Sequence, residues 1–352
     1  MDGSLFQRKH RRPTMATTIE KLPDHLLSNI LIRVPARTLA QMRSVSKPLN
    51  ALLSQPSFIQ SHLHRSIKTN HEILLLFKHF RSNEVTAYPS RTPHLELPNF
   101  VQLPIYADPN DSYIGHELIG AVNGLICFRY VTDIGCFIQI WNPSISALFE
   151  LPELALLGEL RIKFRFGFDP FNDDYKIVRI SERIDVELLV YSSIFREDKV
   201  CGDGHDGRLH WLFFVGDDQD LERIVAFDLG AETFSQIRLP VVVNNMDHNN
   251  VLGVLGGKLC LMSCLKDHNC EVWLMNEYGN AESWAKHHVF SQFSANDMRP
   301  FGFTLRNEFL FASFEVLSIY DPIAAKVKSF MLKVEGDAKI VPYVDSLVWL
   351  TP

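Results

Sequence analysis

The chain has 352 residues, of which 46% are hydrophobic and 22% are charged, a composition typical of a folded globular protein rather than a disordered one. Its formal net charge of −6 argues against a nucleic-acid-binding protein, which normally carries a basic surface, but not against protein partners. The sequence has no apolar run long enough to span a membrane and no apolar signal core near Met1, so we expect neither membrane insertion nor secretion.

The chain has six cysteines, at positions 127, 136, 201, 260, 264 and 270. They could form a set of disulfide bonds, but a chain without a signal peptide is expected to remain in a reducing compartment. We therefore expect free thiols and a cytoplasmic or nuclear protein.

Residues 1–18 are polar and contain a basic cluster between Arg8 and Arg12. Clusters of this kind occur in nuclear-localisation signals. Short basic clusters are also common in solvated segments. We predict a disordered tail over residues 1–18.

Residues 19–66 have a helical pattern that the rest of the chain lacks. After the pair Leu22-Pro23, an apolar stripe at i, i+4 and i+8 spacing consists of Leu26, Leu27, Ile30, Leu31 and Val34. Pro35 ends that helix, and a second stripe follows with Leu39, Met42, Val45, Leu49, Leu52 and Leu53. Such short helices form a small core. We expect them to pack against something else, either as a helical cap on a larger domain or against a partner.

This helical segment resembles an F-box in the order and spacing of its apolar residues, from Leu22-Pro23 to the run 43–47. The resemblance implies docking onto the Skp-type adaptor of a cullin-based ubiquitin ligase. It also implies that the adaptor is contacted by Leu22, Pro23, Leu26, Leu27, Ile30, Leu31, Val34, Pro35, Leu39 and Val45.

One position departs from the F-box pattern, because the family usually has Trp where this chain has Leu49. The loss of an aromatic residue reduces the area that can be buried, so we expect weaker docking than is typical. Pro48, just before it, fits only in the first turn of a helix that begins near Ser46.

From His71 onward the pattern is that of β-strands separated by Gly, Asn, Asp and Pro. A glycine followed by an apolar strand recurs at residues 123–128, 206–211 and 256–261, and strand–turn–strand segments begin at 140, 226 and 319. Equivalent aromatic positions recur at intervals of 36 to 50 residues, which are typical of four-stranded propeller blades. They are Trp141, Tyr191, Phe227, Trp273 and Tyr320.

We therefore predict a mainly β protein with a small α-helical N-terminal module, in which about six blade-like units form a propeller-like domain. A β-sandwich is the alternative, but it would not need equivalent motifs at this spacing. We expect early strands around 73–77 and late strands around 343–350 to pair and close the domain.

The β region, residues 67–352, resembles the plant-type F-box-associated domain. The resemblance rests on nine segments in the family's order, among them residues 122–125, 141–144, 166–170, 207–211 and 319–322. It implies that this domain captures the protein to be ubiquitinated. The family usually has a longer insert than residues 192–208 provide here, so we expect one unit to be incomplete.

No pattern in the sequence indicates an active site, a cofactor or a metal. Nucleophile-elbow, phosphate-loop and His-Glu-x-x-His motifs are missing. The acidic stretch 169–174 lacks the spacing of a calcium loop, so we interpret it as a turn. The positions 260, 264, 268 and 270 have no common zinc-finger spacing, and we expect Cys260 to be a small buried residue of a strand.

Together the two resemblances predict a non-catalytic, substrate-recognition subunit of a Skp–cullin–F-box (SCF) ubiquitin ligase. Its expected partners are the adaptor, through it the cullin, and an unknown target protein, with no nucleic acid and no membrane. Loops 217–220 and 244–250 are candidate target contacts. Alternatives are an F-box protein that acts outside the ligase or is functionally degenerate, and a propeller-fold hydrolase.

Overall fold

The computed structural model describes residues 22–69, 72–77, 85–92, 113–132, 135–151, 162–181, 206–215, 221–243, 248–265, 269–291, 298–334 and 338–350. The predicted tail 1–18 lies outside this part of the chain, as does most of the segment 192–208. Within the described residues, no helix is both long enough and apolar enough to cross a membrane.

Four helices form the N-terminal module: α2 (Asp24–Leu31), α3 (Ala36–Met42), α4 (Lys47–Leu53) and α5 (Pro56–Lys68). Prolines mark their starts, because Pro23 and Pro35 precede α2 and α3 and Pro56 opens α5. Pro48 lies in the first turn of α4, as predicted, and the hydroxyl of Ser46 caps that helix by accepting a hydrogen bond from the Leu49 N–H.

The described strands form six sheets. Three of them are four-stranded antiparallel meanders: β3–β6 (Tyr113–Val122, Leu125–Thr132, Cys136–Asn142, Ala147–Glu150), β12–β15 (His248–Leu255, Lys258–Leu265, Asn269–Met275, Trp284–Ser291) and β16–β19 (Met298–Phe303, Phe309–Ser313, Val316–Asp321, Lys326–Lys333).

The other sheets have fewer described strands. One is three-stranded, β9–β11 (Arg208–Val215, Leu221–Asp228, Thr233–Arg238), and one is two-stranded, β7–β8 (Ile162–Asp169, Asp174–Ser181). The last joins both ends of the β region in the order β2-β1-β20 (Val85–Pro89, Ile73–Phe77, Lys339–Tyr343).

The sheets follow one another in a ring, and each neighbouring pair shares an apolar cluster. The β strands therefore bury their apolar faces between sheets, which explains why one meander would not be stable alone. Each of the six interfaces between neighbouring sheets is represented by one pair of residues that belong to the same cluster: Phe77 and Phe128, Cys127 and Phe166, Val178 and Trp211, Ile224 and Leu261, Met262 and Phe311, Leu76 and Leu310.

The predicted fold class is confirmed: the protein is mainly β, with a helical N-terminal module and a propeller arrangement. Trp141, Trp273 and Tyr320 lie in the third strands of the three four-stranded sheets, as their spacing indicated. The stretch 169–174 is the turn between β7 and β8, where Asp169 accepts backbone hydrogen bonds from Phe171 and Asn172.

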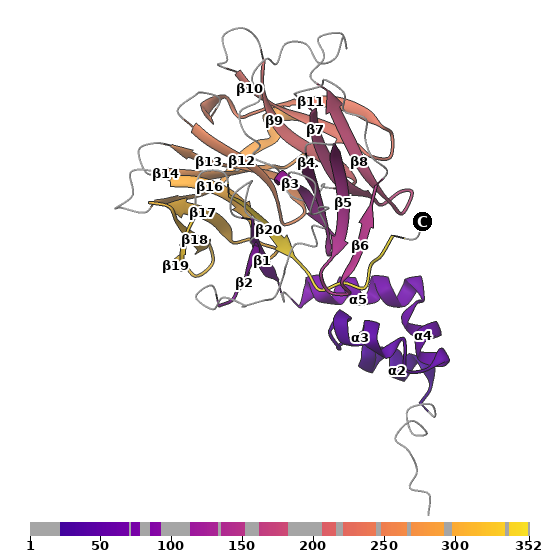
Figure 1. Cartoon of the computed structure of the whole chain (residues 1–352). Helices are drawn as coiled ribbons and strands as arrows, with labels where there is room; N and C mark the ends of the chain where they lie inside the picture. The colour runs from indigo at the N-terminus through magenta and orange to yellow at the C-terminus, as the bar shows by residue number, and fades with distance from the viewer. Residues whose placement is uncertain are drawn as a thin grey trace, which may run out of the picture.

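The ring closes where β1 pairs with β20, so the prediction of early strands around 73–77 is confirmed. The predicted late strand over 343–350 is wrong, because β20 ends at Tyr343 and residues 344–350 are not part of a sheet. Those residues instead cross the end of the β domain that faces the helices (Figure 1).

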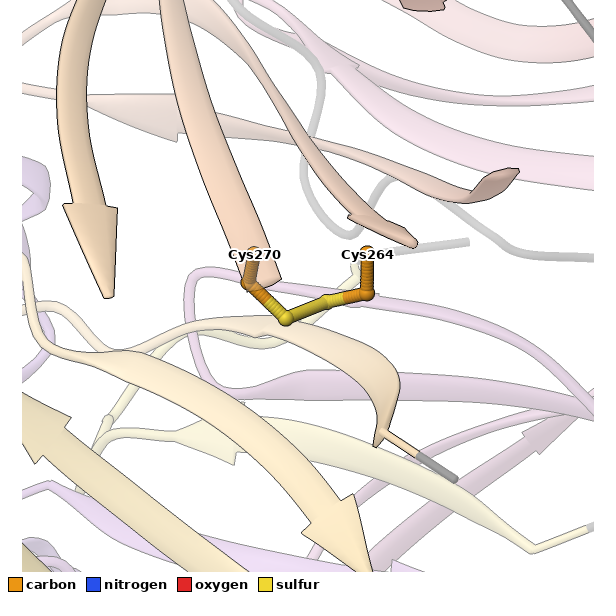
Figure 2. The surroundings of a disulfide bond; sticks show 2 residues. All are labelled: Cys264 and Cys270. Atoms are coloured by element: carbon orange, nitrogen blue, oxygen red, sulfur yellow. A yellow bond between two sulfur atoms is a disulfide. The ribbon is translucent and has the colours of Figure 1, made fainter. Parts of the chain in front are cut away.

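The expectation of free thiols is wrong for one pair, because Cys264 and Cys270 form a disulfide bond (Figure 2). The two residues stand directly opposite each other on β13 and β14, and both are fully buried. Cys127, Cys136 and Cys260 are buried and form no disulfide bond, as expected. Cys201 lies outside the described residues.

Reduction is expected to weaken the fold through this disulfide. The disulfide closes a short loop, so its reduction should lower the free energy of unfolding by about 2 kcal/mol. Urea unfolding with and without dithiothreitol measures this difference. The double variant Cys264→Ala with Cys270→Ala should show no dependence on the reductant. A wild-type chain that unfolds at the same urea concentration in both conditions would contradict the prediction.

Candidate protein-docking site

The N-terminal module exposes apolar side chains along one face of α2. Leu26 and Ile30 are four residues apart, which places them on the same side of α2, and Leu22 lies two residues before that helix begins. Leu22, Leu26 and Ile30 are 39%, 45% and 54% exposed. Val45, after α3, is 72% exposed. We call Leu22, Leu26 and Ile30 the α2 stripe. A helix of a folded module normally turns such a stripe toward the core, so its exposure is typical of a surface that another protein covers.

Four of the other predicted adaptor contacts lie deeper. Leu31 and Leu39 are buried in the core of the module itself, and Leu27 and Val34 are half-buried against that core. Pro23 and Pro35 are exposed at the starts of α2 and α3. Leu49 is half-buried against the same core, so its side chain supports the module from within. The structure thus places Leu26 and Ile30 together on an exposed face of α2, with Leu22 exposed just before the helix, and the adaptor contact remains a prediction.

The C-terminal segment 344–350, which we call the strap, attaches the module to the β domain. Leu347 is fully buried in the core of the helical module. Val344 and Val348 pack with Leu63 of α5 and with residues of β4 and β7. Both sides of the strap therefore contribute to continuous apolar packing between the helices and the sheets.

Hydrogen bonds fix the strap in place. The carboxylate of Asp345 accepts a bond of 2.6 Å from the Ala36 N–H at the start of α3 and another from the Ser144 hydroxyl. Asn142 Nδ2 donates to the carbonyls of Ser346 (3.0 Å) and Val348 (2.8 Å). Asp345 thus serves as the anionic cap that α3 lacks locally, since Pro35 has no capping side chain.

The strap also fits closely against the β3–β4 turn. Gly124 has φ of +79°, and a Cβ there would lie 2.3 Å from the Cβ of Ser346. Only glycine combines that backbone conformation with such a close approach. Gly124, which the sequence pattern placed at the start of a strand, therefore also allows the strap to attach the helical module.

The β domain offers no comparable apolar surface in its described part. Phe171, Val241, Phe314 and Ile323 are highly exposed, but they lie in four separate connections between strands, and isolated exposed apolar residues are ordinary. The candidate target loops 217–220 and 244–247 lie outside the described residues. His248–Asn250 belong to β12, and Asn250 is buried there.

A buried carboxyl group and a buried imidazole have strongly shifted pKa values. Burial raises the pKa of Glu72 to about 7 and lowers that of His116 to about 4. They lie on different sheets, near β1 and on β3. Within the residues that the structure describes, no three or more His, Cys, Asp and Glu side chains cluster as metal ligands.

Sequence analysis missed Asp345, Leu347 and the disulfide. The apolar residues of 344–350 resemble those of a strand, so periodicity alone could not reveal a strap. The disulfide had a readable signal, because Cys264 and Cys270 are only six residues apart and the pairing of β13 with β14 places them opposite each other.

Comparisons with known proteins agree with both parts of the chain. Residues 19–61 match the F-box domain, and residues 74–195 and 185–340 match the F-box associated beta propeller domain. In Arabidopsis thaliana, F-box protein CPR1 is 28% identical over 80% of this chain and 75% of its own length. F-box/kelch-repeat protein At3g23880 is 23% identical over 75% of this chain and 78% of its own. F-box protein At4g22390 is 25% identical over 75% and 72%.

Proposed function

Because the chain belongs to the family of F-box proteins that carry an F-box-associated β-propeller domain, we propose that it is a substrate-recognition subunit of an SCF ubiquitin ligase. The observation that carries the proposal is the α2 stripe, which stays exposed on a module that already has its own buried core. In this role the stripe docks onto a Skp-type adaptor and the propeller binds the target protein.

The proposed subunit carries out no chemistry itself. It accelerates ubiquitin transfer by holding the target near the charged ubiquitin, which raises the effective concentration of the reacting groups. The strap supports this role, because it joins adaptor-binding helices and target-binding sheets through a continuous buried interface. Such a subunit acts in the cytoplasm or the nucleus, where the ligase partners would meet it.

The α2 stripe provides the direct test. In the variant Leu26→Asp with Ile30→Asp, two carboxylates would be buried on docking, so the affinity for a purified plant Skp-type adaptor is expected to fall at least about 30-fold. Isothermal titration calorimetry measures the affinity. Because both side chains are exposed in the free chain, circular dichroism and the melting temperature should hardly change.

The matched control carries Val241→Asp with Ile323→Asp, which adds the same charge at two apolar residues of the β domain that are 92% and 94% exposed. This variant should bind the adaptor like the wild type. The proposal fails if wild type shows no binding, or if the stripe variant binds as tightly as the control.

A further inference from the structure

A second feature of the helical module lies at the end of the α2 stripe. A cleft of about 510 Å³ separates the C-terminal ends of α2 and α5. Six of its seven lining residues have polar or charged side chains, and Ile32 is the apolar one. The lining residues are Asn29, Ile32, Arg33, His64, Arg65, Lys68 and Thr69.

The charge of the module is opposite to that of the whole chain. Residues 22–69 contain six Arg and Lys but one acidic residue, Asp24, whereas the chain as a whole has a net charge of −6. Asp24 lies in the first turn of α2, at the opposite end from the cleft. No carboxylate of the described residues forms an ion pair with Arg33, Arg65 or Lys68, so these three cations face the cleft without internal neutralisation.

The negative C-terminal ends of the helix dipoles offset part of this positive charge but not all of it. Two helix C-termini meet here, and each contributes about half a negative charge, against three full positive charges. The last carbonyls of α5 also have other partners, because the Thr69 hydroxyl donates to the Arg65 carbonyl and Arg91 donates to the Thr69 carbonyl. The cleft therefore keeps a positive potential that is available to a ligand.

The cleft is continuous with the α2 stripe. Arg33 lies in the turn that follows α2, and its N–H donates a hydrogen bond of 3.2 Å to the Ile30 carbonyl, so the two residues adjoin. A protein that covers Leu26 and Ile30 would thus reach Arg33 and the cleft at the same time. An open, partly exposed cleft beside an apolar stripe suits a charged segment of that protein better than an enclosed small molecule.

We propose that this cleft binds an acidic segment of the adaptor, as a charged extension of the apolar docking surface. The inference rests on the proposed function, since the adaptor is the protein that would cover the stripe. Charge pairs at the edge of an interface act mainly on association rate and salt dependence. The adaptor affinity should therefore fall as salt rises, and the cleft should cause most of that dependence.

The test compares two double charge reversals in adaptor titrations at 50, 150 and 500 mM NaCl. Arg33→Glu with Lys68→Glu should weaken binding about 10-fold at the lowest salt and much less at the highest, and its affinity should depend less on salt than that of wild type. The control is Arg238→Glu with Lys326→Glu, at exposed positions of β11 and β19, which should follow the wild type at every salt concentration.

The outcomes separate the cleft from the stripe. If Leu26→Asp with Ile30→Asp abolishes binding while the cleft variant matches wild type in affinity and salt dependence, the adaptor role stands and the cleft proposal is overturned. If the stripe variant binds normally, the proposed function itself fails. Inorganic phosphate tests whether the cleft instead binds a small anion. If millimolar phosphate stabilises wild type but not the cleft variant, and both proteins bind the adaptor with equal affinity, the acidic-segment proposal is overturned in favour of a small-anion site.

Discussion

Replacing Leu347 with Ala is expected to detach the helical module from the β domain without unfolding the propeller. Leu347 is fully buried among the module's apolar residues, and a buried leucine shortened to alanine costs about 3 kcal/mol. That loss falls on a four-helix module whose own core is small. The ring of sheets closes through β1 and β20 and does not depend on this side chain.

Hydrogen exchange with mass spectrometry gives the measurement that distinguishes local from global loss. In the Leu347→Ala variant, amides of α2 to α5 should exchange faster, whereas those of β3–β6 and β12–β15 should keep their wild-type protection. Equal loss of protection in helices and strands would show that the strap stabilises the whole chain, contrary to the prediction. Ile323→Ala, at a residue 94% exposed, serves as the unaffected control.

Asp345→Ala tests the polar half of the same attachment. The substitution removes the acceptor of the Ala36 N–H and of the Ser144 hydroxyl, and hydrogen bonds to a charged group contribute about 1.5 to 3 kcal/mol each. The helices should again lose protection first. Saturating adaptor should restore it, because a ligand that binds only the folded module stabilises that state.

The strap illustrates what the sequence pattern could not predict. The spacing of Leu26, Ile30 and Leu31 indicated a helix, and it is one. Periodicity could not tell that Leu26 and Ile30 remain exposed while Leu31 is buried, because that difference depends on which neighbours pack against α2. Leu347 belongs to the same buried cluster as Leu31, and it lies more than 300 residues away in the chain.

The β domain was easier to predict, because its signals are local. Tight turns containing Asn, Asp and Gly fix several of its hairpins, and the recurring aromatic residues of the third strands reveal the repeat. The disulfide was not predicted, because the expected reducing compartment favours free thiols. The strand register, which is a local property, places the two thiols opposite each other.

Glu72 is expected to make the stability of the fold decrease with rising pH around neutrality. Its side chain is 2% exposed, at the junction between α5 and β1, and Oε1 accepts a hydrogen bond of 2.7 Å from the Leu305 N–H in the β16–β17 turn. Burial is the largest cause of its pKa of about 7; the bond from Leu305 and the nearby Ser90 and Arg306 lower the pKa but do not offset burial.

The sign follows from proton binding. An acid whose pKa is raised on folding binds more protons in the folded state, so stability is highest below its unfolded pKa of about 4.5 and falls until the pH passes about 7. The shift corresponds to at most about 3 kcal/mol. His116 acts in the opposite sense between about pH 4 and 6.5, because its lowered pKa makes the folded state bind fewer protons.

The variant Glu72→Gln isolates the contribution of the carboxyl group. Urea unfolding of both proteins at pH 5, 6, 7 and 8 gives two stability curves, and His116 contributes equally to each, so it cancels in their difference. We expect that the variant gains up to about 3 kcal/mol relative to wild type between pH 5 and 8. Any constant cost of the buried amide also cancels. A difference that does not change with pH would show that Glu72 has the same proton affinity in the folded and unfolded chain, and the junction between α5 and β1 would then have no part in the response to pH.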